Sequence, residues 1–207
     1  MRSILCYGDS NTWGYDPETG ERFGRDERWP GVLQARLGDT AHVIEAGLSG
    51  RTSAFDDPFD SNLNGLTFLP VCLATHQPID VVVVFLGTND VFLPEGITAH
   101  YAAQGVGALV DVIARSEAGP RGEPPKTLVV VPPPFAPLGR WEPWSPHGEA
   151  ESARFSEAFP RMAEEHPCAL LDLRGVVDSS PIDGIHFDVP AHAGIGAAVA
   201  KALTDMR

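Results

Sequence analysis

Positive charge is scarce in this sequence, which carries 15 Lys and Arg residues against 28 Asp and Glu residues. The formal net charge is therefore −13 at pH 7. A strongly acidic chain is repelled by nucleic-acid phosphates and by anionic membrane surfaces. We therefore expect no nucleic acid and no membrane as partners, and a neutral small molecule rather than a polyanion as substrate.

Cysteine is also rare, and the three residues Cys6, Cys72 and Cys168 cannot all pair with one another. Each lies among apolar residues, so we expect buried free thiols in a reducing compartment. No apolar run approaches the roughly 20 residues that a membrane-spanning helix needs. No signal-peptide pattern precedes the first apolar run, which starts within a few residues of Met1. These features predict a cytoplasmic protein.

Motifs of several other protein classes are missing. There is no Gly-x-x-x-x-Gly-Lys phosphate loop, and no Gly-x-Ser-x-Gly elbow of the α/β-hydrolase type. A metal hydrolase built on His42, His76 or His186 would lack paired ligand spacing. We therefore expect neither a metal ion nor a cofactor.

Short apolar runs recur along the chain, and each ends in turn-forming residues. The run from Val81 to Leu86 is wholly apolar and mostly β-branched, which is typical of a central parallel strand covered on both faces. Four further runs, each of four to six residues, complete a set of five predicted strands. The five strands are expected at residues 4–7, 42–46, 81–86, 127–131 and 168–173.

Segments with helical spacing of apolar residues lie between these strands. They are residues 29–37, 65–76, 98–116, 149–165 (interrupted or bent near Pro160) and a last helix from about residue 190. Strictly alternating strands and helices predict one α/β domain over residues 1–207. We expect a three-layer, flavodoxin-like fold whose five-stranded parallel sheet has the order 2-1-3-4-5 and helices on both faces.

The first apolar run breaks abruptly into Gly8-Asp9-Ser10-Asn11. The carboxyl end of a strand in a parallel sheet is where such folds meet their ligands, so Ser10 is a candidate nucleophile. Asp9 can hold the turn by accepting local backbone N–H groups. Alternatively, Ser10 is only a capping residue at a helix start.

Other strand ends supply the partners that a nucleophilic serine needs. His186 can act as the base, and Asp183, three residues earlier, can fix the tautomer of its imidazole. The backbone N–H groups of Ser10 and Gly50, with the side-chain amide of Asn89, are candidate donors to an oxyanion. Taken singly, Gly50 could be a turn glycine, Asn89 a helix cap and Asp183 an ordinary turn residue.

Four motifs in sequence order carry a resemblance to a known family. They are Gly8-Asp9-Ser10, the glycine at 50, Gly87-Thr88-Asn89-Asp90 and Asp183-x-x-His186. Together they resemble the four blocks of the GDSL, or SGNH, hydrolases over almost the whole chain. The segments 45–52, 63–65 and 183–186 further resemble bacterial arylesterases that also transfer acyl groups.

The resemblance implies a serine esterase that hydrolyses short-chain or aryl esters through an acyl-enzyme, with Ser10, His186 and Asp183 as its triad. Gly50 and Asn89 would complete the oxyanion hole. Substrate contacts are expected from Asn11, Tyr15, Thr88 and Ile185. A small pocket is expected near Tyr15, Phe92, Phe135 and Ile185.

The chain departs from those arylesterases in having Asn11 for leucine, Gly50 for alanine and Tyr15 for tryptophan. The resemblance to ester hydrolases survives these three differences. They count against efficient acyl transfer in water, which needs a dry and restricted pocket.

Three alternatives stay open at this point. The first is a carbohydrate acetyl esterase of the same fold. The second is a flavodoxin-like binding module in which Asp9 and Asp90 would hold Mg²⁺, although no lysine follows the fifth strand as such a site would need. The third concerns assembly, because Trp141 and Trp144 in the polar segment 135–148 could line the pocket entrance or a homo-oligomer contact.

Overall fold

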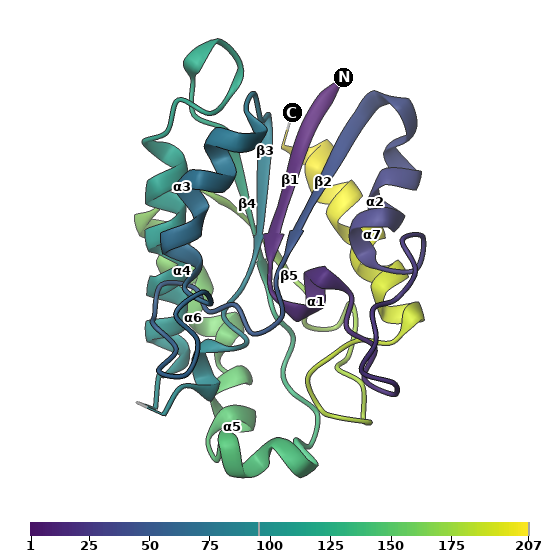
Figure 1. Cartoon of the computed structure of the whole chain (residues 1–207), viewed down its shortest axis with the longest axis vertical. Coiled ribbons are helices and arrows are strands. Elements are labelled where there is room, and N and C mark those ends of the chain that lie inside the picture. The colour runs from purple at the N-terminus through teal and green to yellow at the C-terminus, as the bar shows by residue number, and fades with distance from the viewer. Residues whose placement is uncertain (95, 207) are drawn as a thin grey trace.

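A computed structural model describes residues 1–94 and 96–206, and its centre is a five-stranded parallel sheet (Figure 1). The strands stand side by side in the order β2-β1-β3-β4-β5, which confirms the predicted fold class. Their bounds are Arg2–Gly8 for β1, Ala41–Gly47 for β2, Val81–Phe85 for β3, Lys126–Val131 for β4 and Ala169–Asp172 for β5.

Helices cover both faces of the sheet and form the outer layers of a three-layer sandwich (Figure 1). One face carries α3, α4 and α6, and the other carries α2 and α7. Two short helices, α1 and α5, lie near the carboxyl ends of the strands (Figure 1). The bounds are Ser10–Trp13 for α1, Trp29–Leu37 for α2, Gly65–His76 for α3, Ala99–Ala114 for α4, Gly148–Ser152 for α5, Phe155–Glu165 for α6 and Val189–Asp205 for α7.

Every side chain of β3 is buried, because alternate residues enter two separate hydrophobic cores. Val82 and Val84 pack under α3 and α4, whereas Val81, Val83 and Phe85 pack under α2 and α7. A strand whose residues enter the cores on both sides has no solvated face, which explains its unbroken apolar sequence. The sheet is thereby fixed as a rigid base for the loops that leave its carboxyl ends.

We expected the 149–165 helix to be interrupted or bent near Pro160, but the interruption lies elsewhere. The chain forms two helices, α5 and α6, separated at residues 153–154, and Pro160 lies exposed inside α6. The break is set by contacts with other elements: the Ser152 hydroxyl accepts from the Phe135 backbone N–H at 2.9 Å. The Glu151 carboxylate likewise accepts from Ala99 N–H, in the first turn of α4, at 2.7 Å. Such long-range anchors leave no local sequence signal.

Segment 135–148 is ordered over the surface, as expected, and contains the 3-10 turn η4 at Gly139–Trp144. The three thiols are unpaired in the described residues, but only Cys6 is fully buried, while Cys72 and Cys168 are half-buried. No helix in the described part of the chain is long and apolar enough to cross a membrane. The cytoplasmic location stays a prediction.

Candidate active site

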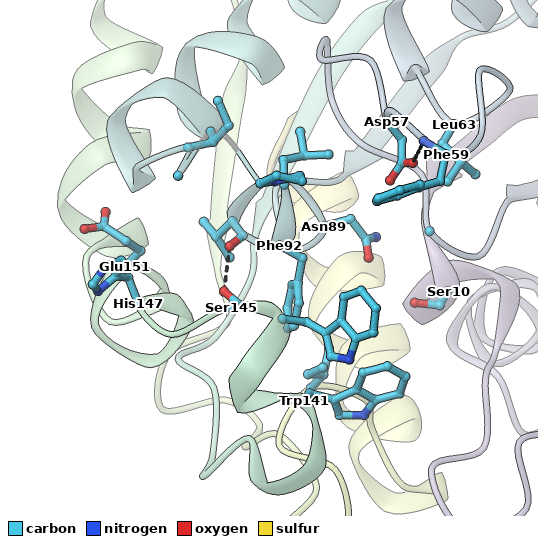
Figure 2. A pocket seen from close by; sticks show the side chains of 18 of the residues that line it. Ser10, Asp57, Phe59, Leu63, Asn89, Phe92, Trp141, Ser145, His147 and Glu151 are labelled. Atoms are coloured by element: carbon cyan, nitrogen blue, oxygen red, sulfur yellow. Dashed lines mark hydrogen bonds between the residues drawn. The ribbon is translucent and has the colours of Figure 1, made fainter.

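The turn after β1 holds Ser10 at the start of α1. Asp9 caps this helix by accepting the Asn11 backbone N–H at 2.9 Å. Gly8 is required by close packing, because a Cβ there would lie 2.0 Å from the Thr12 hydroxyl and 2.8 Å from the Phe85 carbonyl oxygen. Ser10 is only 5% exposed, and its hydroxyl faces a cavity at the carboxyl edge of the sheet (Figure 2).

A chain of two hydrogen bonds joins Ser10, His186 and Asp183. The Ser10 Oγ lies 2.9 Å from His186 Nε2, and the His186 Nδ1 lies 2.6 Å from Asp183 Oδ2. The second carboxylate oxygen, Oδ1, accepts the backbone N–H groups of Ile185 and His186, each at 3.0 Å. The structure thus brings Ser10 together with His186, 176 positions later in the sequence, and with Asp183, three positions before His186.

The electrostatics of Asp183 favour its ionised form. Burial raises the pKa of this carboxyl, but the His186 imidazole and the two backbone N–H donors outweigh burial and hold the pKa below its usual range. An ionised Asp183 accepts from Nδ1–H of His186, which leaves the Nε2 lone pair facing the Ser10 hydroxyl. This tautomer is the one that can take a proton from Ser10.

The predicted oxyanion donors line the same cavity as Ser10. Gly50 has a φ of 81°, a conformation that L side chains rarely adopt, and its N–H donates to no group in the described part of the chain. Asn89 uses one hydrogen of its Nδ2 to bond the Arg51 carbonyl oxygen at 3.0 Å. Since a carboxamide has two N–H donors, one hydrogen stays available to a ligand.

Arg51 has a structural role close to these donors. Its Nη1 donates to the Gly8 carbonyl oxygen at 2.7 Å and to the Ala46 carbonyl oxygen at 2.5 Å. The guanidinium also lies over the Tyr7 ring, 4.2 Å from its centroid. The single buried cation of this region therefore ties the ends of β1 and β2 together in the described structure, and it does not line the cavity.

Asp9 and Asp90 are both fully buried near Ser10 and Asn89. Burial raises the pKa of Asp9 to about 7, with a further contribution from the charge of Asp90, and raises the pKa of Asp90 to about 6. The structure gives no support to their reading as a Mg²⁺ pair. Among the described residues, no three His, Cys, Asp or Glu side chains are placed to hold a metal ion together.

The cavity has a volume of about 1000 Å³ and mixes aromatic walls with a few polar groups (Figure 2). Tyr15 lies against the imidazole of His186, with ring centroids 4.2 Å apart. Phe59 and Trp144 stand at the mouth and are 83% and 67% exposed. Among the described residues, the remaining aromatic side chains of the lining are Phe92 and Trp141, and the carboxylates are Asp57, Asp60 and Glu151.

Two of the four expected substrate contacts line the cavity. Tyr15 and Ile185 do, whereas Asn11 and Thr88 are 2% and 1% exposed and are not among its lining residues. Both side chains are buried, and neither Asn11 Oδ1 nor Thr88 Oγ1 makes a hydrogen bond with the described residues. Phe135, expected at the pocket, instead packs behind the wall against Phe92 and Phe155.

Sequence reasoning missed most of the outer cavity. Phe59, Leu63, Leu93 and His147 lie in or beside polar loops whose long-range placement has no periodic signal. A phenylalanine within the acidic stretch 56–60 is a local signal that could have found Phe59, because a large apolar side chain in a polar segment often marks a binding surface.

Comparisons with known proteins agree with this geometry. The model of the GDSL-like Lipase/Acylhydrolase family matches residues 6–193. Among curated proteins, the Escherichia coli (strain K12) Thioesterase 1/protease 1/lysophospholipase L1 is 27% identical over 169 residues, which is 82% of this chain. The chain thus spans only 65% of the length of that relative.

Two solved structures are similar along their full length. The native M. smegmatis aryl esterase superposes with a TM-score of 0.94 at 38% identity, covering 100% of both chains. A carbohydrate acetylesterase from Sinorhizobium meliloti has a TM-score of 0.94 at 36% identity, again covering 100% of both chains. Since the family model also covers nearly the whole domain and includes every strand end described above, this chain belongs to the GDSL-like lipase/acylhydrolase family of hydrolases.

Proposed function

We propose that the protein is a serine esterase acting on small, neutral esters. The observation that carries the proposal is the hydrogen-bonded chain from Ser10 Oγ through the His186 imidazole to the Asp183 carboxylate. A serine hydroxyl is a weak nucleophile by itself, and a neutral imidazole at 2.9 Å is a suitable base. The buried carboxylate stabilises the imidazolium that forms when the proton moves.

The reaction then runs in two halves. Ser10 Oγ attacks the ester carbonyl while its proton passes to His186 Nε2, and collapse of the tetrahedral intermediate expels the alcohol, which takes that proton. Water then attacks the acyl-serine and gives a proton to His186 Nε2; collapse of the second tetrahedral intermediate breaks the bond from the acyl carbon to Ser10 Oγ, which takes that proton back as the acid leaves. In both halves the negative oxygen would accept hydrogen bonds from the N–H groups of Gly50 and Ser10 and from the free Nδ2 hydrogen of Asn89.

The cavity walls favour an apolar alcohol or acyl group. Tyr15, Phe92 and Trp141 offer ring faces and edges beside Ser10, which suits aryl and short alkyl esters. The described lining includes no Lys or Arg but three carboxylates, so an ester that carries its own negative charge meets repulsion. Aryl esters are therefore the first candidates, in line with the activity named for the M. smegmatis neighbour.

A carbohydrate acetyl ester is the second candidate, and one observation favours it. Asp57 and Asp60 lie at the mouth beside the exposed ring of Phe59, and carboxylates beside an aromatic platform suit sugar hydroxyls and a sugar face. Hydrolysis is expected to dominate over acyl transfer in either case, because the exposed rings of Phe59 and Trp144 leave the mouth open to water.

The proposal is tested by labelling with a fluorophosphonate and by turnover of an ester panel of phenyl esters, alkyl acetates of increasing length and sugar acetates. Wild-type protein should take up one label and hydrolyse at least one class. Ser10→Ala should lose both, with turnover reduced by about 10³-fold or more and an unchanged melting curve. Ser116→Ala, outside the cavity, is the matched control. Retained turnover in Ser10→Ala would refute the assignment.

A further inference from the structure

The two groups assigned to the oxyanion hole besides Ser10 come from different loops. Gly50 lies in the loop after β2, whereas Asn89 lies in the loop after β3. Strands β2 and β3 are not neighbours, because β1 stands between them. Sheet hydrogen bonds therefore hold the two strand ends only through β1 and do not join the two loops directly, so contacts between the loops contribute to the spacing of these donors.

Two adjacent residues of the β3 loop make these contacts. Asn89 Nδ2 donates to the Arg51 carbonyl oxygen at 3.0 Å, next to Gly50. Asp90 accepts the Ser53 backbone N–H on both carboxylate oxygens, at 3.2 Å and 3.1 Å, and also accepts the Ser53 hydroxyl. Both side chains of the second contact are fully buried, with 0% exposure.

Ser53 is itself held in place from a third element. A Cβ on Gly105 of α4 would lie 2.1 Å from Ser53 Oγ, so the hydroxyl fits against the bare backbone of that helix. With α4 behind it and Asp90 in front, the Ser53 hydroxyl has one direction in which to donate. The contact between the loops is therefore rigid.

Joining two loops through a buried carboxylate is unfavourable in free energy, because the charged group loses its hydration. Burial disfavours the charge, and it raises the pKa of Asp90 to about 6. The nearest buried cation, Arg51, spends its Nη1 donor on the carbonyls of Gly8 and Ala46. The carboxylate, however, accepts one backbone N–H and one hydroxyl from the same residue, and these hydrogen bonds together fix both the distance and the orientation of Ser53 relative to Asp90.

We propose that Asp90 is a positioning residue that sets the spacing of the oxyanion donors by binding Ser53. This inference rests on the proposed esterase function and extends it to a residue that touches neither the cavity nor Ser10. Weakening the contact lets the two loops drift apart, so the tetrahedral intermediate loses stabilisation while the bound ester does not. Weakening the contact should therefore lower kcat and leave KM nearly unchanged, because the donors stabilise negative charge that develops only during the attack.

The test uses Ser53→Ala, which removes only the hydroxyl, and Asp90→Asn, which keeps the size of the side chain, since Asp90→Ala could fail to fold. Active sites are counted with the fluorophosphonate, so kcat refers to folded, reactive enzyme only. We expect kcat to fall by about tenfold, less than the 10²–10³-fold typical of deleting a donor outright, with KM changed by less than about twofold. The affinity for a boronic acid, whose adduct with Ser10 mimics the tetrahedral intermediate, should fall by the same factor as kcat.

Thr52→Val is the matched control. This neighbouring hydroxyl is also buried and donates to the Phe55 carbonyl oxygen at 2.6 Å, but it bonds only within its own loop. It should lower the melting temperature and leave both kcat per active site and boronic-acid affinity unchanged.

Lower stability in Ser53→Ala and Asp90→Asn with wild-type kcat and boronic-acid affinity would show that Asp90 is only structural and would overturn the inference. A rise in KM at constant kcat would overturn it as well. Failure of the underlying esterase proposal looks different, because wild-type protein would then take up no label and hydrolyse no ester.

Discussion

Replacing Asp183 with asparagine should damage catalysis far more than the loss of one charge suggests. In the wild-type protein, Oδ1 accepts the backbone N–H groups of Ile185 and His186, each at 3.0 Å, while Oδ2 lies 2.6 Å from His186 Nδ1. The asparagine oxygen will take the position facing the two backbone donors, because an amide NH₂ there would meet two N–H groups. Its NH₂ group is then turned toward His186.

This orientation imposes the wrong tautomer. With an NH₂ donor facing it, Nδ1 must act as an acceptor, and the imidazole proton moves to Nε2. Nε2–H then donates to Ser10 Oγ and cannot take its proton. The upper expectation is a loss in kcat/KM of about 10⁴-fold, which corresponds to about 5.4 kcal/mol of transition-state stabilisation.

Stopped-flow hydrolysis of a phenyl ester, with active sites counted by fluorophosphonate, measures the loss. Asp178→Asn and Asp188→Asn are the controls, because both carboxylates are exposed and near in sequence to the pair. Asp188 caps α7 by accepting the Ala191 N–H at 2.9 Å, a role that asparagine can keep. If either control proves as damaging as Asp183→Asn, the acid is assigned to the wrong residue.

Three further outcomes are expected. Asn89→Ala should lower kcat by about 10²–10³-fold with little change in KM, and an effect on KM alone would make Asn89 a substrate contact instead. If the exposed Trp144 belongs to a subunit contact, light scattering should show a smaller assembly for Trp144→Ala than for wild type, whereas monomers in both would remove that interface. Burial lowers the pKa of His192 to about 4, so the folded chain binds this proton less readily than the unfolded chain does. The free energy of unfolding should therefore fall by up to about 3 kcal/mol as the pH drops from about 6.5 to 4, and His192→Gln, followed by urea unfolding across this range, should flatten the dependence.

Local sequence determined the elements and the inner site. The unbroken apolar sequence of β3 indicates that the strand is buried on both faces. Strands that alternate with helices along the chain form a parallel sheet, for which few strand orders are possible. Asp183 and His186 are three residues apart, so one turn presents both, and the Gly8-Asp9-Ser10 turn carries its own helix cap. Each of these features needs only neighbours in the chain, and each is therefore visible in the sequence.

Only the tertiary structure shows which residues of distant loops line the cavity. Phe59 and Trp144 meet at one cavity mouth although 85 positions separate them in the printed sequence, and neither lies in a periodic segment. Asn11 and Thr88 follow the same strand ends as Ser10 and Asn89, yet both are buried away from the cavity, because successive residues of a tight turn point in different directions. Short-range patterns thus fixed which residues could react, whereas the long-range packing of loops decided which of them face the substrate and how their spacing is held.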